Sequence, residues 1–128
     1  MWLTMPRHGR NLILSELEFR ARIVGYILDG RPEHAVELLS EYYGVSEPSL
    51  RVGTVKRHRK VLACYVDKEK RIYLSKSQLL TDPFVILHEF YHHLRASSIA
   101  KNRQIEKRAD LFALNFIQEF KRSSVTST

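Results

Sequence analysis

Two histidines and a glutamate in the segment 88–92, HEFYH, form an HExxH pattern, which is typical of a zinc-binding helix. At about 100° of rotation per residue, His88 and His92 lie about 40° apart around a helix, so both imidazoles can reach one ion from consecutive turns. Glu89 lies on the neighbouring flank, where its carboxylate can take a proton from a zinc-bound water and later pass it to a leaving amine. The spacing therefore predicts a zinc site with Glu89 as general base and acid.

A catalytic zinc site usually has three protein ligands and leaves one position for water, so a third ligand is required. Glu106 is the candidate, because it opens a stretch with the three-and-four spacing of a core-facing helix. Asp110 follows one turn later on the same face and can accept the second ring N–H of His88, which fixes the tautomer. The apolar positions of this second helix are Ile105, Ala109, Phe112, Ala113, Phe116, Ile117 and Phe120.

The segment HEFYH, followed by EKRAD at 106–110, resembles the gluzincin zinc peptidases, which carry HExxH and then ExxxD on a later helix. The resemblance implies that the zinc ligands are His88, His92 and Glu106. It also implies that Glu89 is the general base and acid and that Asp110 orients His88. In its shortness the chain is similar to the minigluzincins and to the ImmA/IrrE-like proteins. The implied activity is zinc-dependent hydrolysis of peptide bonds in a protein or peptide substrate.

The resemblance raises three further expectations. Larger gluzincins stabilise the oxyanion with a histidine or tyrosine from a downstream domain, so here either an upstream side chain takes that role or catalysis is weak. Minimal scaffolds of this kind can also be latent, with the cleft filled by a neighbouring molecule or a terminal segment, here the residues before Asn11 or those from Ser123 onward. Gluzincins pair the substrate with an edge strand, for which the strand Ile72-Tyr73-Leu74 is a candidate; a core strand is the alternative.

The elements that position these residues are marked by capping residues and periodicity. The HExxH helix is predicted over about 83–97, because Thr81 or Asp82 can cap it and Pro83 suits its first position. A buried stripe of Ile86, Phe90 and Leu94 faces away from the metal. The linker from Leu94 to Asn102 is long enough to turn the glutamate-bearing helix back against it.

Earlier in the chain, a capping-box pattern over 15–18 predicts the start of a first helix that ends near Asp29-Gly30. Pro32 opens a second helix and Gly44 ends it. The period then changes to that of strands, which are expected at Leu50 to Val55, Val61 to Val66, and Arg71 to Ser75, with a hairpin over 67–70.

The predicted fold class is therefore α+β: two N-terminal helices, a small three-stranded sheet, and two active-site helices packed against each other. A chain of 128 residues fits a single zincin-like domain over 1–128, with loosely ordered tails at 1–10 and 123–128.

The composition indicates the cellular environment of this domain. No apolar run approaches the roughly 20 residues that span a bilayer, and residues 1–14 lack the features of a signal peptide, so we expect a cytoplasmic protein. Cys64 is the single cysteine and is interpreted as a small buried core residue rather than a reactive thiol.

The charge pattern supports an alternative function. The chain has a net charge of +7 and a pI of about 9.8. Part of this positive charge comes from a basic cluster at 56–60, KRHRK, which can neutralise phosphates or bind an acidic protein. The alternative is a nucleic-acid-associated module with a structural zinc. It is not favoured, because no nucleic-acid-binding motif accompanies the cluster. His93, about 100° from His92, cannot share the metal with correct geometry and is interpreted as an ordinary partly buried or surface residue. Tyr91 is interpreted as a packing residue.

Overall fold

The computed structural model describes residues 9–55, 61–96 and 104–126. Its elements follow the predicted α+β order, with one short 3-10 helix, η1, that the sequence did not indicate. They are α1 (Gly9–Leu28), α2 (Pro32–Tyr43), β1 (Ser49–Val52), β2 (Ala63–Val66), β3 (Arg71–Leu74), η1 (Ser77–Thr81), α3 (Pro83–Arg95) and α4 (Gln104–Thr126).

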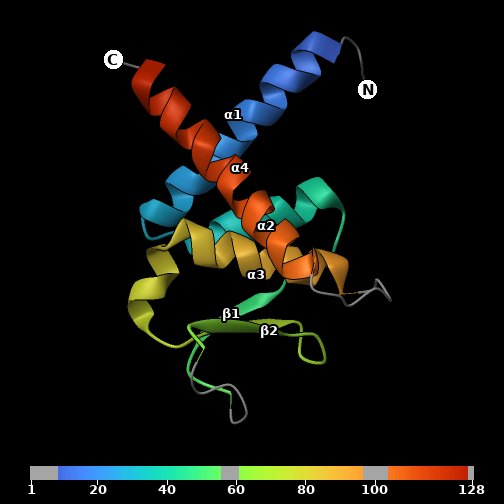
Figure 1. Cartoon of the computed structure of the whole chain (residues 1–128), viewed down its shortest axis with the longest axis vertical. Coiled ribbons are helices and arrows are strands. Elements are labelled where there is room, and N and C mark those ends of the chain that lie inside the picture. Colours follow the sequence, from blue (N-terminus) through green and yellow to red (C-terminus); the bar gives the residue numbers. More distant parts are fainter. Residues whose placement is uncertain (1–8, 56–60, 97–103, 127–128) are drawn as a thin grey trace.

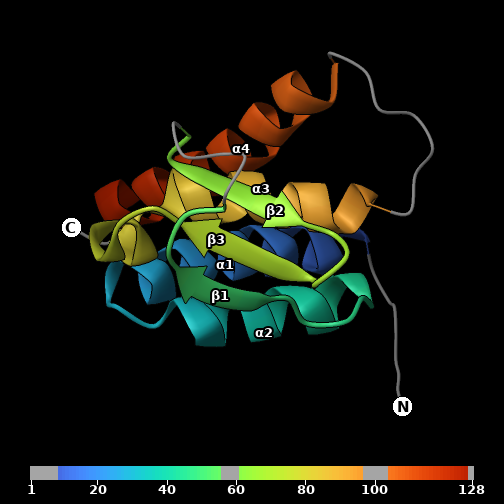
Figure 2. The same cartoon turned by 90° about the horizontal axis from the view of Figure 1, so that it is seen from below.

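The three strands form one sheet in the order β1-β3-β2, and all four helices lie on one face of it (Figures 1 and 2). β3 pairs in parallel with β1 and antiparallel with β2. Ile72 and Leu74 of β3 are fully buried and join α3 residues such as Ile86 and Phe90 in the core. Helix α3 therefore lies against the sheet, with α1 and α4 crossing on its far side (Figure 1).

Local sequence explains how α3 begins. Of the two expected caps, Asp82 takes the role: its carboxylate accepts a hydrogen bond from the Val85 amide at 3.2 Å, and Pro83 occupies the first turn. Ile86 and Phe90 of the predicted stripe are fully buried, and Leu94 packs against the core. The helix ends at Arg95, two residues earlier than expected; position 97 lies outside the described residues.

The first and last helices extend further toward the chain ends than the sequence predicted. α1 already runs from Gly9, so the capping-box start at 15 is wrong, because those residues lie inside a longer helix. Residues 123–126 continue α4. The tails expected at 1–10 and 123–128 are therefore helical at 9–10 and 123–126. The second helix is as predicted: Gly44 follows it with φ of 69°, a left-handed conformation that suits glycine.

The strand predictions need correction. The second and third strands are shorter than expected, at Ala63–Val66 and Arg71–Leu74. The first strand ends at Val52 instead of Val55, because Gly53 adopts φ of 154°, which a residue with a Cβ rarely does. The strand Ile72-Tyr73-Leu74 is the central one, so its interpretation as the substrate-pairing edge is wrong and the core-strand alternative holds. The edge strand that packs against α3 is β2. The basic cluster 56–60 and most of the linker between α3 and α4 lie outside the described residues.

None of the helices in the described ranges has an apolar stretch long enough to cross a membrane.

Candidate metal centre

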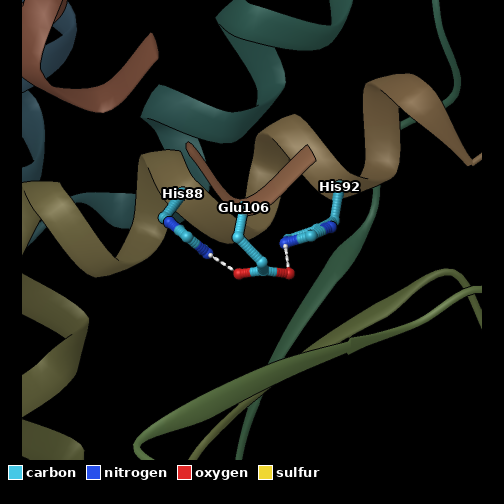
Figure 3. Close-up of side chains that lie close together, drawn as sticks. All are labelled: His88, His92 and Glu106. Carbon is cyan, nitrogen blue, oxygen red and sulfur yellow. Dashed lines mark hydrogen bonds and ion pairs between the residues drawn. The ribbon is translucent and has the colours of Figure 1, made fainter. Parts of the chain in front are cut away.

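The three predicted ligands converge on one point between α3 and the first turn of α4 (Figure 3). The Glu106 carboxylate lies between the two imidazoles. One of its oxygens is 3.0 Å from Nε2 of His88, and the other is 3.1 Å from Nε2 of His92. The two histidine rings, one turn apart on α3, have centroids 5.1 Å apart. The sequence-based expectation that positions 88, 92 and 106 share one site agrees with this geometry.

The donor set fits a zinc ion. With zinc–ligand distances of about 2.0–2.1 Å, a tetrahedral site separates neighbouring ligand atoms by roughly 3.3 Å. The two nitrogen–oxygen contacts are close to that value, and one ligand atom from each residue lies within 4.8 Å of the others. Two imidazoles and a carboxylate are also a donor set that suits zinc. Small side-chain movements would therefore accommodate the ion without rearrangement of either helix.

A second carboxylate lies against His88, where the sequence predicts an orienting residue. Asp110 Oδ1 lies 2.9 Å from His88 Nδ1, one helical turn after Glu106 on α4. A carboxylate accepts hydrogen bonds, so in the neutral ring this contact places the proton on Nδ1 and leaves the Nε2 lone pair facing the centre. For His92, burial lowers the pKa of the ring, which favours the neutral, metal-binding form.

Glu89 is buried beside the ligands, with only 9% of its surface exposed. Burial raises the pKa of its carboxyl to about 7, and the charge of Glu106 adds to that rise. The nearby His88 and a hydrogen bond from the Tyr65 main-chain amide act in the opposite direction. The carboxyl of Glu89 is thus poised to exchange a proton near neutral pH, which general acid–base catalysis requires.

The same burial predicts a pH-dependent stability difference in the zinc-free protein. The unfolded chain ionises Glu89 near 4.5 and the folded chain near 7, so the folded state binds more protons between these values. Stability therefore falls as pH rises through this interval. We expect Glu89→Gln to be more stable than the parent at pH 8, by on the order of 2–3 kcal/mol, and nearly equal at pH 4.5. Urea unfolding at both pH values measures this; a difference independent of pH would contradict it.

A cavity of about 540 Å³ opens beside the centre, between β2, the end of α3 and the start of α4. Its charged and metal-ligating lining includes Glu89, His92, Glu106 and Arg95, the last without an ion pair among the described residues. The remaining lining is largely apolar, with Val61, Ala63, Cys64, Tyr65, Asp67, Ala96 and Ile105. Its size and mixed lining suit part of a peptide more than a metal ion alone.

One edge of this cavity is formed by strand β2. Leu62 accepts a hydrogen bond from the Ser75 amide, so even-numbered residues here direct their main-chain groups toward β3. Ala63 and Tyr65 consequently direct theirs toward the outer edge, where the Tyr65 amide meets Glu89. Sequence reasoning missed Tyr65. The alternation of side chains along β2 places the Tyr65 ring on the core face of the sheet. It does not show which helix lies beside the outer edge of this strand.

Three other residues test the sequence interpretations. His93 is buried and hydrogen-bonded to Tyr65 and Ser46, so it lies deeper than the partly buried or surface position expected, and both its ring nitrogens have partners other than a metal. The Tyr91 ring packs against Phe112 with centroids 5.3 Å apart, as expected. Cys64 is only half-buried and lines the cavity, which corrects its assignment to the core. Burial still raises the pKa of its thiol, so it is not an activated nucleophile.

The structure does not agree with the expectation that the C-terminal residues from Ser123 onward fill the cleft of their own chain. Residues 123–126 continue α4, whose first turn carries Glu106. At 1.5 Å per residue, Ser123 lies about 25 Å along the axis from that glutamate, so these residues do not fill the cavity.

Comparison of the chain with protein-family models, with curated proteins and with solved structures found no match.

Proposed function

We propose that this chain is a zinc-dependent endopeptidase. The observation that carries the proposal is the convergence of His88, His92 and Glu106 on one point, with the buried carboxyl of Glu89 lining the adjoining cavity. Zinc held by these three side chains would polarise the scissile carbonyl and make a water molecule more acidic.

In this mechanism the chain's own residues bind, orient and transfer protons. Glu89 takes a proton from the attacking water and delivers it to the amide nitrogen as the peptide bond breaks. Its raised pKa matches both halves of that task, because the same carboxyl must first accept and then donate. Asp110 keeps the His88 ring in the ligating tautomer.

The substrate that fits the cavity is an extended polypeptide. The outward main-chain groups of Ala63 on β2 are available to pair with a substrate backbone, as strand addition requires. Arg95 contributes a positive charge to a lining that also contains apolar residues and the carboxyl groups of Asp67, Glu89 and Glu106. A protein or peptide, rather than a small metabolite, therefore agrees best with the shape of the site.

The direct test is to incubate the zinc-loaded protein with casein and a peptide library and to identify products by mass spectrometry. Internal cleavage that stops on chelation and returns with zinc supports the proposal. A zinc-loaded protein that cleaves nothing, including after dilution to release a neighbouring molecule from the cavity, contradicts it. We further propose a cytoplasmic setting, on the sequence-based grounds given above.

Asp110 provides a quantitative test of the proposed centre. We expect Asp110→Asn to weaken zinc binding by roughly 10- to 100-fold, because the neutral amide is a poorer acceptor for the His88 N–H. Competition with a chromophoric chelator measures the affinity. Asp29→Asn, at an exposed carboxylate after α1, is the control. Equal affinities for Asp110→Asn and the parent would contradict the orienting role.

A further inference from the structure

His93 links three parts of the fold. It is buried, with 7% of its surface exposed, and both ring nitrogens have partners. Nε2 lies 2.6 Å from the Ser46 carbonyl oxygen, which only accepts hydrogen bonds, so Nε2 carries a proton. In the neutral ring Nδ1 is then an acceptor, and the Tyr65 hydroxyl 2.7 Å away donates to it. His93 thus ties α3 both to β2 and to the loop before β1.

Tyr65 in turn contacts α3 through its side chain. Its hydroxyl bonds to His93, one helical turn after Glu89, and Tyr65 and Glu89 line the same cavity. The hydroxyl also donates to Asp67 Oδ1 over a longer distance, 3.2 Å. The Tyr65 and His93 rings meet edge to face, with centroids 5.2 Å apart. β2 is therefore attached to α3 one turn after Glu89.

This attachment matters because β2 is short and, among the described strands, pairs only with β3. It has four residues and bonds to β3 through its even-numbered positions. Its outer side depends on contacts with α3 for its position. A shift of this strand would move its outward main-chain groups relative to the buried Glu89 carboxyl, which lines the same cavity.

We propose that Tyr65 and His93 are positioning residues, whose hydrogen bond holds the outer edge of strand β2 against α3, beside the Glu89 carboxyl. The inference rests on the proposed function for its catalytic consequence. The attachment itself is a property of the zinc-free fold and can be measured without turnover.

The first test is Tyr65→Phe, which removes only the hydroxyl. We expect zinc stoichiometry to stay the same and kcat for peptide hydrolysis to fall roughly 10-fold, with a smaller change in KM, because a displaced base slows the chemical step. Tyr91→Phe is the matched control: its ring packs on Phe112, and the described residues include no partner for its hydroxyl. Its kcat should be that of the parent. A Tyr65→Phe protein with parental kcat would overturn the proposal.

Two substitutions of His93 separate positioning from general stability. In His93→Asn, the shorter side-chain amide can accept the hydrogen bond from the Tyr65 hydroxyl but cannot reach the Ser46 carbonyl. In His93→Gln, the longer amide can donate to the Ser46 carbonyl but no longer accepts from the Tyr65 hydroxyl. Each variant lacks one hydrogen bond, so Tm should fall by similar amounts. We expect the asparagine variant to keep most of the parental kcat and the glutamine variant to match Tyr65→Phe. If kcat instead followed Tm in both, the contact would be structural only.

Amide hydrogen exchange supplies a readout that does not depend on activity. In zinc-free protein, exchange at the Tyr65 amide should be about 10-fold faster in Tyr65→Phe and His93→Gln than in the parent, and near the parental rate in His93→Asn. Unchanged exchange in all three variants would overturn the proposed attachment. If the parent cleaved no peptide while exchange behaved as expected, the proposed function would fail and the attachment would stand.

Discussion

Glu89→Gln is expected to bind zinc like the parent and to lose peptide hydrolysis by about 10²- to 10⁴-fold in kcat. Glutamine preserves the volume of the side chain but can neither accept the proton from water nor return it to the leaving nitrogen. Among the described residues that line the cavity, the other two carboxyl groups already have partners: Glu106 contacts the two imidazoles, and Asp67 is bonded to Lys70 at 2.8 Å. The loss should therefore appear in kcat while zinc content remains unchanged.

The measurement is steady-state kinetics on one cleaved peptide, with zinc content determined on the same samples. Glu47→Gln is the matched control, since Glu47 is exposed and has no ion pair in the described part of the chain. A Glu89→Gln protein that holds zinc and retains parental kcat would remove Glu89 from the mechanism. Combined with its expected gain in zinc-free stability at pH 8, this variant separates a catalytic role of the carboxyl from a role in folding.

Glu106→Gln is expected to reduce zinc affinity by at least about 100-fold. A neutral amide replaces the only negatively charged ligand of the site, and the loss of a direct ligand should exceed the 10- to 100-fold that outer partners typically contribute. The fold should survive, because the Glu106 side chain is 64% exposed and lies at the start of α4. Chelator competition gives the affinity, and circular dichroism checks the helix content.

The control for this variant is Glu119→Gln on the same helix. Glu119 pairs with Arg122 at 3.1 Å and is more than three turns from the centre, so zinc affinity should be parental. Parental affinity in Glu106→Gln would show that the third ligand is elsewhere. In that event the resemblance to gluzincins would extend only to the HExxH helix.

The site was largely predictable because its chemistry follows from spacing within two helices. His88 and His92 share a face by helical geometry alone, and Glu106 and Asp110 do the same on α4. The core-facing residues of α4, including Ala109, Ala113 and Phe116, were marked by the same periodicity and are buried. Once both apolar faces pack together, the two polar faces meet at their common edge.

What could not be predicted depends on contacts between distant segments. Sheet order is set by tertiary packing, so nothing in the Ile72–Leu74 sequence showed that β3 is central. The role of Tyr65 depends on β2 lying beside Glu89, and that of His93 on a loop carbonyl 47 positions earlier in the chain. The half-buried position of Cys64 has the same origin, because the helices cover only the face of the sheet that carries Ile72 and Leu74, and Cys64 lies on the other face.

X-ray absorption at the zinc K edge is the most direct test of the central claim, that side chains from two helices bind one ion. For protein loaded with one equivalent of zinc, we expect four nitrogen or oxygen neighbours at about 2.0–2.1 Å, with the multiple-scattering signal of two imidazoles. That signal should fall to one imidazole in His92→Ala. A parent spectrum without imidazole scattering, or failure to retain zinc, would contradict the account.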